Sequence, residues 1–108
     1  MANTFKLKTK ANVGVTTSNV YTVPSATTTV VIGVTLANTT GSSINVGVGV
    51  TRASSDDVKL MKNVPIPQGS SFEFMAGNKV VLETTDTLTA ESDVNNSLDV
   101  ALTIMEIT

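Results

Sequence analysis

Hydrophobic residues recur at every second position through much of this chain, and this spacing constrains the fold more than any other feature. The even-numbered positions are apolar between residues 30 and 36 and again between residues 44 and 50. A period of two is typical of a β-strand with one buried face. Val and Thr, whose branched side chains favour strands over helices, are abundant in the same segments. The pattern therefore predicts an all-β protein.

Turn residues separate further short alternating runs at fairly even spacing, which is typical of a sandwich or barrel. We expect strands at residues 3–9, 12–16, 19–23, 28–37, 44–52, 57–62, 70–75, 79–84 and 98–107, and a further short strand at 87–90. A chain of 108 residues fits one domain with one core. The expected fold is a single antiparallel β-sandwich domain over residues 1–108, with about eight strands, either jelly-roll or immunoglobulin-like.

The phase of the alternation also predicts the core. The inward-facing residues are expected to be Val30, Ile32, Val34, Leu36, Ile44, Val46, Val48, Val50, Val58, Leu60, Phe72, Phe74, Val80, Leu82, Leu98, Val100, Leu102 and Ile104. Near Met105 the alternation shifts and leaves Ile107 on the opposite face. We therefore expect a bulge or an exposed hydrophobic end there.

The turn at residues 38–42 is expected to close a hairpin between the two clearest strands. In such a hairpin Gly33 lies opposite Gly47 or Gly49 on the outward face. Glycine within a strand costs about 0.5–1 kcal/mol relative to alanine, so this face is either ordinary exposed surface or covered by a second layer from this chain or a neighbouring subunit. The predicted protein-contact residues are Gly33, Thr35, Gly47, Gly49, Met105 and Ile107.

The composition excludes several classes of function. The chain contains neither histidine nor cysteine, so it lacks the usual general base, the cysteine nucleophile, thiolate metal sites and disulfides. The net charge of -2 and the four aromatic residues do not suit nucleic-acid binding. We therefore expect a protein that is not an enzyme, with no catalytic, cofactor-binding or metal site and no nucleic-acid partner.

Two charged segments leave alternatives open. Asp86, Glu91 and Asp93 lie in a loop-rich stretch and could hold a calcium ion, but their spacing matches no known calcium loop, and solvated acids are the alternative. The lysines at 6, 8 and 10 alternate with Phe5 and Leu7, which indicates either a basic stripe for an acidic partner or an edge strand protected by lysine.

No signal peptide and no apolar run of membrane-spanning length is evident. The expectation is a protein that is made in a cytoplasm and has no membrane partner.

Three segments, at residues 19–50, 62–89 and 98–108, resemble small all-β virion proteins of tailed bacteriophages, particularly those of aquatic and cyanobacterial phages. The resemblance rests on turns and strand ends, namely Tyr-Thr-Val-Pro at 21–24, Leu-Ala-Asn-Thr at 36–39, Pro-Ile-Pro-Gln-Gly-Ser at 65–70, Leu-Glu-Thr-Thr-Asp at 82–86 and Glu-Ile-Thr at 106–108.

This resemblance implies a structural component of the virion that is made in the host cytoplasm and binds neighbouring virion proteins. Capsid decoration or cement is the favoured role, with the major capsid protein as partner and a homo-oligomer, preferably a trimer, as the assembled form. A tail, neck or fibre component is one alternative. A carbohydrate-binding or adhesive module is another, for which Tyr21 is the aromatic residue expected to be free.

Overall fold

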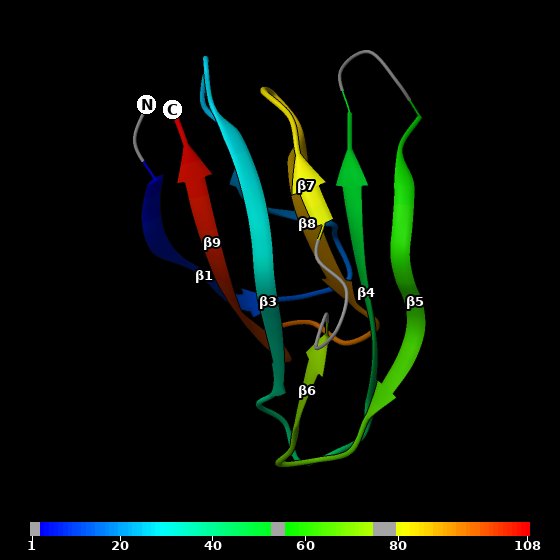
Figure 1. Ribbon diagram of the computed structural model, residues 1–108. Helices are drawn as coiled ribbons and strands as arrows, with labels where there is room; N and C mark the ends of the chain where they lie inside the picture. Colours follow the sequence, from blue (N-terminus) through cyan, green and yellow to red (C-terminus); the bar gives the residue numbers. More distant parts are fainter. Residues whose placement is uncertain (1–2, 53–55, 75–79) are drawn as a thin grey trace.

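The computed structural model describes residues 3–52, 56–74 and 80–108, and these form two antiparallel β-sheets packed face to face (Figure 1). The five-stranded sheet has the order β1 (Asn3–Val13), β9 (Leu98–Ile107), β3 (Thr28–Asn38) and β6 (Ser71–Phe74), and β7 (Val80–Leu82) also pairs with β3. The four-stranded sheet has the order β2 (Ser18–Thr22), β8 (Thr87–Ser92), β4 (Ile44–Thr51) and β5 (Val58–Ile66). The predicted antiparallel β-sandwich is confirmed.

The order of the strands distinguishes between the two predicted sandwich types. An immunoglobulin fold places its first two strands side by side in one sheet. Here β1 and β2 lie in different sheets, and the chain changes sheet at almost every connection except the β4–β5 hairpin and the step from β6 to β7. This alternation is the jelly-roll arrangement, in which long antiparallel pairs wrap around one core.

The predicted hairpin across residues 38–42 is wrong. The strand β3 pairs with β9, β6 and β7, whereas β4 pairs with β8 and β5, so the turn carries the chain from one sheet to the other. Both strands keep their apolar residues inward, but they face each other across the core instead of lying side by side. The predicted pairing of Gly33 with Gly47 or Gly49 is wrong for the same reason.

The core follows the predicted phase in most strands. Eleven of the predicted residues are buried, namely Val34, Leu36, Ile44, Val46, Val48, Val50, Leu82, Leu98, Val100, Leu102 and Ile104. The remaining buried hydrophobic residues are Val13, Tyr21, Val23, Val31, Met61, Ile66, Leu88 and Ala90. The side chain of Phe74 lies outside the described residues.

Two irregularities in strand pairing explain the mispredicted core positions. In β3 the register shifts between Val31 and Gly33, and the extra residue puts Val31 in the core while Val30 and Ile32 are only half-buried. In β5 two shifts opposite Val48 bury Met61 in place of Leu60. Three other predicted core residues lie near open sheet edges, so Val58 and Phe72 are exposed and Val80 is half-buried.

The C-terminal strand β9 keeps its alternation to the end, so the predicted bulge near Met105 is absent from the described pairing of β9 with β1. The inward position after Ile104 is taken by Glu106, which is buried, and Met105 and Ile107 are half-buried on the other face. Ile107 therefore lies opposite the core, as predicted.

Several strand limits also differ from the prediction. Residues 3–13 form the single strand β1, which replaces the first two predicted strands, and β5 continues through Pro65 to Ile66. Proline is tolerated there because β5 is an edge strand. Residues 75 and 79 of two predicted strands lie outside the described residues.

Candidate protein-contact face

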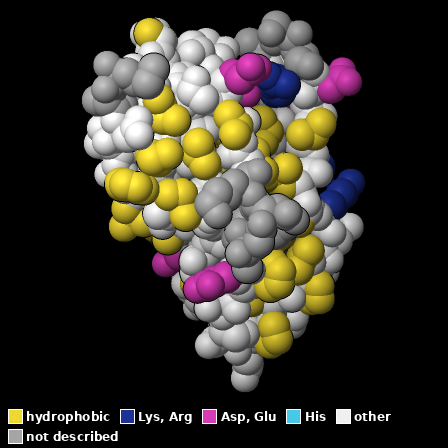
Figure 2. Space-filling view, in the orientation of Figure 1, with side chains coloured by type: hydrophobic (Ala, Val, Ile, Leu, Met, Phe, Trp, Pro, Cys, Tyr) yellow, Lys and Arg dark blue, Asp and Glu magenta, His cyan; other side chains and the backbone are white. Residues whose placement is uncertain are grey.

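The outer surface of the five-stranded sheet carries the largest group of exposed hydrophobic side chains that converge on one face. We call it the outer apolar face, and it is formed by Phe5, Leu7, Val30, Val81, Met105 and Ile107. The exposed fractions of Phe5, Leu7 and Val81 are 70%, 64% and 58%. Figure 2 shows hydrophobic side chains on the side of the molecule where β3 and β9 lie, and others toward β4 and β5. Contiguous exposed apolar surface is typical of sites that contact other molecules, so this face is the candidate site.

Strand register brings these side chains together from four strands. Phe5 lies opposite Met105, Met105 lies opposite Val30, and Val30 lies opposite Val81. Directly opposed residues in antiparallel strands point to the same face of a sheet. The four side chains therefore form a continuous row across the sheet, and Leu7 and Ile107 flank it.

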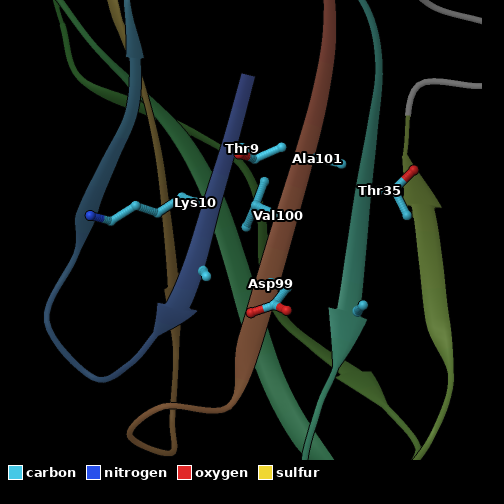
Figure 3. A pocket seen from close by; sticks show the side chains of 8 residues that line it. Thr9, Lys10, Thr35, Asp99, Val100 and Ala101 are labelled. Atoms are coloured by element: carbon cyan, nitrogen blue, oxygen red, sulfur yellow. The ribbon is translucent and has the colours of Figure 1, made fainter. Parts of the chain in front are cut away.

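A shallow hollow of about 220 Å³ lies on the same face, separated from this row by the paired residues Leu7, Thr103 and Gly33. Figure 3 shows Thr9 and Ala101 directed toward it from neighbouring strands, whereas Lys10 points away. The hollow exists because small side chains, including Ala101 in β9 and Ala37 in β3, line this end of the face. Larger side chains occupy the other end. Asp99 lies at its margin and accepts a hydrogen bond from the backbone N–H of Asn12 at 3.0 Å.

The outer surface of the four-stranded sheet is polar by contrast. Lys59 Nζ of β5 lies 2.6 Å from Glu91 Oε1 of β8, so an ion pair spans the intervening strand β4. The hydrogen bond from Lys59 is the main cause of the lowered pKa of Glu91. A methyl group on Gly47 would lie 3.3 Å from Glu91 Cγ, and one on Gly49 would lie 2.8 Å from the carbonyl oxygen of Val58. Both glycines are therefore covered by side chains and backbone of this chain.

The structure divides the predicted contact residues between the two outer surfaces. Gly33, Thr35, Met105 and Ile107 all lie on the outer surface of the five-stranded sheet, as their pairing partners show. Gly47 and Gly49 lie on the outer surface of the four-stranded sheet and are buried.

Sequence reasoning did not assign the most exposed members of the outer apolar face, Phe5, Leu7 and Val81, to a contact site. For Phe5 and Leu7 the signal was present, because both alternate with lysines and so must point away from them.

The lysine side of β1 faces the core margin and builds a polar network there. Lys6 Nζ lies 2.7 Å from Glu106 Oε1, and the Tyr21 hydroxyl donates a hydrogen bond to Oε2 of the same carboxylate. Lys8 Nζ lies 6.0 Å from the centre of the Tyr21 ring. The hydrogen bond from Lys6, followed by that from Tyr21, lowers the pKa of Glu106, and burial with the Glu106 contact raises the pKa of Tyr21 to about 12. Tyr21 is thus buried, not free as predicted.

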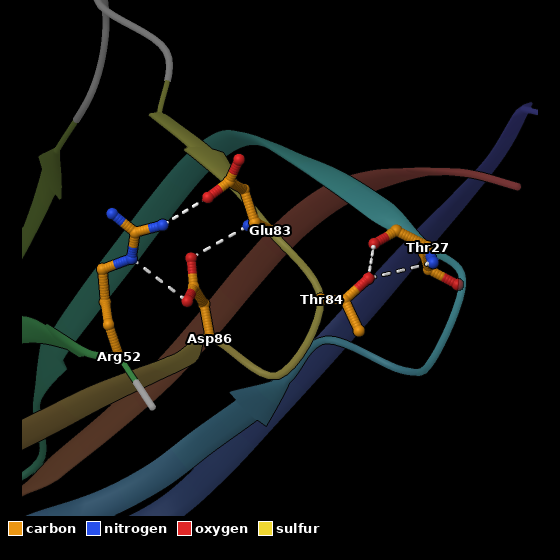
Figure 4. A network of polar contacts seen from close by, with 5 residues as sticks. All are labelled: Thr27, Arg52, Glu83, Thr84 and Asp86. Atoms are coloured by element: carbon orange, nitrogen blue, oxygen red, sulfur yellow. Dashed lines mark hydrogen bonds and ion pairs between the residues drawn. The ribbon is translucent and has the colours of Figure 1, made fainter. Parts of the chain in front are cut away.

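The loop acids do not come together. Asp86 precedes β8 and Asp93 follows it, so they lie at opposite ends of that strand. Asp86 Oδ1 accepts from Arg52 Nε at 3.2 Å, and Arg52 also pairs with Glu83 (Figure 4). In the same view Thr84 donates to the carbonyl oxygen of Thr27. Within the described residues no three acids are grouped closely enough to hold a metal ion.

Glu91 and Asp93 do line one hollow of about 320 Å³. Each is already engaged, Glu91 with Lys59 and Asp93 with the backbone N–H of Asn45 at 2.9 Å. The pKa of Glu91 is lowered by its contact with Lys59, whereas a general acid requires a raised pKa.

The comparisons with known proteins concern the fold. No protein-family model and no curated protein matches this sequence. A solved structure of Bacillus endospore appendages, described as a novel family of disulfide-linked pili, superposes with a TM-score of 0.59 and 13% sequence identity, covering 99% of this chain and 87% of that chain. At this identity the likeness shows a shared β fold. In the part of the chain that the structure describes, no helix is long and apolar enough to cross a membrane.

Proposed function

We propose that this protein is a non-enzymatic structural subunit of a larger protein assembly, and that the assembly is the virion of a tailed bacteriophage, with capsid decoration or cement as the role. The observation that carries this proposal is the outer apolar face. Its members Phe5, Leu7 and Val81 are exposed, whereas the outer surface of the four-stranded sheet is polar and carries the ion pair between Lys59 and Glu91.

Leaving such a face in water is unfavourable by roughly 25 cal/mol per Å² of apolar surface. Contact with another protein subunit removes that surface from water without any reaction. A small molecule is a poorer occupant, because the hollow on this face is shallow and no aromatic ring lines it.

The choice of a phage particle is supported by the sequence resemblance over residues 19–50, 62–89 and 98–108. The absence of cysteine also suits a particle that leaves the cell, since its stability does not depend on redox conditions. We infer that the chain is made in the host cytoplasm and joins other virion proteins there, with the major capsid protein as the first candidate partner.

A second candidate is a subunit of an extended filament, which includes the tail or fibre of a virion. Its support is the β fold shared with the endospore pilus protein. Because this chain has no cysteine, such a filament would be held together without disulfides, unlike the appendages described for that protein.

The carbohydrate-binding alternative has less support. Sugar rings commonly stack on exposed aromatic side chains, but Tyr21 is buried and bonded to Glu106. The exposed aromatic residues of the described chain are Phe5 and Phe72, which point to opposite faces of the five-stranded sheet.

The test is co-sedimentation of the purified chain with assembled capsids encoded by the same genome, with light scattering of the chain alone as reference. Saturable binding that a Leu7→Arg variant loses supports decoration. A matched Thr51→Arg variant, which places the same charge on the polar outer surface, should bind normally. A chain that does not bind capsids but forms filaments supports the second candidate. Chain that does neither contradicts both.

A further inference from the structure

The outer surface of the five-stranded sheet is organised in three rows that run across the strands. The central row contains Leu7, Thr103 and Gly33, which are paired in register. On one side, two residues away in β1 and β9 and three residues away in β3 because of its bulge, lies the row of large side chains formed by Phe5, Met105, Val30 and Val81. Two residues away on the other side lies the row of small side chains formed by Thr9, Ala101 and Thr35.

We propose that this face pairs with the same face of a second copy of the chain, around a two-fold axis that follows the central row. This inference deepens the proposed function, since it names the first partner of the outer apolar face. A rotation about such an axis exchanges the large row with the small row. Phe5 and Met105 of each copy then enter the hollow beside Thr9 and Ala101 of the other.

The sizes of the two features agree. The hollow has a volume of about 220 Å³, and an apolar cavity of about 150 Å³ is large enough to hold a benzene ring. Gly33, at the centre of the face, has no side chain to project from the sheet, and a Cβ placed there would meet nothing within 4 Å. This position therefore leaves room for the second copy. Leu7, which is 64% exposed, meets the Leu7 of the second copy.

The charge distribution also favours a second copy over a different protein. The charged residues whose strand pairing places them on this face are Glu73 and Asp99, and both lie outside the central row, with Asp99 lining the hollow. A two-fold interface brings identical residues together near the axis. Uncharged residues at its centre are therefore compatible with the interface, whereas charged residues there would repel their own copies. A different partner is commonly recognised through complementary charges, which the centre of this face lacks.

The available area suits a reversible dimer. Three strands of about ten residues, with a rise of ~3.3 Å and a spacing of ~4.8 Å, present a flat area of roughly 500 Å² per copy. Two copies then cover about 1,000 Å², the lower limit for a specific interface. Face-to-face sheets pack about 10 Å apart with their strands nearly aligned, and this geometry allows the large side chains to enter the hollow.

The experiment is sedimentation of the purified full chain over a wide concentration range, combined with isotope-filtered NMR on a mixture of labelled and unlabelled chains. We expect a concentration-dependent dimer and a contact between the Met105 and Ala101 methyl groups of different copies. Within one copy these residues are four positions apart in β9, about 13 Å, so a direct contact can arise only between copies.

Two variants separate the interface from folding. Ala101→Arg should weaken the dimer by about a hundredfold or more, because a long charged side chain fills the hollow and must be buried when the second copy binds. Thr51→Arg, on the polar outer surface, should leave the dimer unchanged. Circular dichroism and urea unfolding confirm that both variants fold.

Three results overturn this inference: a monomer at every concentration, a trimer, or a dimer whose intermolecular contacts come from other residues. A monomeric chain that still binds capsids rejects the two-fold pairing and leaves the proposed function in place. A dimer with the expected methyl contact that binds no capsid supports the two-fold pairing and contradicts the proposed function.

Discussion

Lys6 and Glu106 form an ion pair, with 2.7 Å between Nζ and Oε1, that fastens the edge strand β1 to β9 at the margin of the core. The carboxylate side chain is 7% exposed, and the Tyr21 hydroxyl of β2 binds its second oxygen. Val13 is the one residue of β1 that is buried. The strand therefore depends on backbone hydrogen bonds and on this network more than on apolar packing.

Glu106→Gln is expected to lower the free energy of unfolding by about 1–3 kcal/mol, because Lys6 loses its partner and the buried site loses a charge-assisted hydrogen bond. Urea unfolding measures the change. The matched control is Glu73→Gln, which alters an exposed carboxylate of β6 and should change stability by less than about 0.5 kcal/mol.

The loss should also depend on pH. The pKa of Glu106 is lowered in the folded state, so its contribution is complete above the ordinary pKa of 4.5 and disappears as the pH falls through the folded value. The difference between wild type and Glu106→Gln should therefore shrink as the pH falls below the ordinary pKa of 4.5. A difference that stays constant down to pH 2 contradicts the assigned role of the carboxylate.

Tyr21 gives a second, independent measure of the same network. Burial and the contact with Glu106 raise its pKa from 10.0 to about 12. The neutral phenol therefore stabilises the fold fully below pH 10, and this contribution is lost as the pH rises toward 12. Because Tyr21 is the single tyrosine and the chain has no tryptophan, tyrosinate absorbance reports it directly. Titration near the ordinary value in the folded protein would show that the phenol is not buried.

The period of two in the sequence was sufficient to predict the sandwich and the inward residues of regular strands such as β4 and β9. It could not predict how the strands connect. Two consecutive strands with inward even-numbered residues fit a hairpin and a crossing between sheets equally well, and the turn at 38–42 is compatible with both. Which of the two connections forms depends on β9, which pairs with β3, and on β8, which pairs with β4. Both strands lie more than 35 residues away in sequence.

Local irregularities account for the other mispredictions. The bulge in β3 places Val31 in the core instead of Ile32, and a single extra residue has no distinct sequence signal within the five consecutive apolar or small residues 30–34. Glu106 occupies a core position because Lys6 and Tyr21 compensate its charge, and neither partner is near it in sequence. Two of the six residues of the outer apolar face were predicted as contact residues, since the outward positions of Met105 and Ile107 follow from alternation alone.

Two strand glycines on opposite outer surfaces should respond differently to the same substitution. Gly49→Ala is expected to lower stability by about 1–3 kcal/mol, because its Cβ would lie 2.8 Å from the carbonyl oxygen of Val58 and the strands must shift. Gly33→Ala should raise stability by about 0.4–1 kcal/mol, since its Cβ meets nothing within 4 Å and the unfolded chain loses freedom. Urea unfolding of the isolated chain at low concentration measures both. Equal effects of the two substitutions would contradict the conclusion that side chains and backbone of this chain cover Gly49 in β4.

Asn38 holds the crossing between the sheets, and its removal should affect the whole fold. Its side-chain amide donates to the carbonyl oxygens of Ser42 at 2.7 Å and Ile66 at 3.0 Å, and its Oδ1 accepts from the backbone N–H of Thr40 at 2.9 Å. The residue is 5% exposed, so truncation leaves buried polar groups without partners.

Asn38→Ala is therefore expected to lower the free energy of unfolding by about 2–4 kcal/mol, whereas Asn19→Ala, at an exposed position of β2, should change it by less than about 0.5 kcal/mol. Thermal and urea unfolding provide the values. Hydrogen exchange adds a spatial test, because the Asn38 variant should lose protection first at the adjoining ends of β3, β4 and β5, which its side chain connects. If protection is lost uniformly or only at β1, the crossing does not depend on this amide.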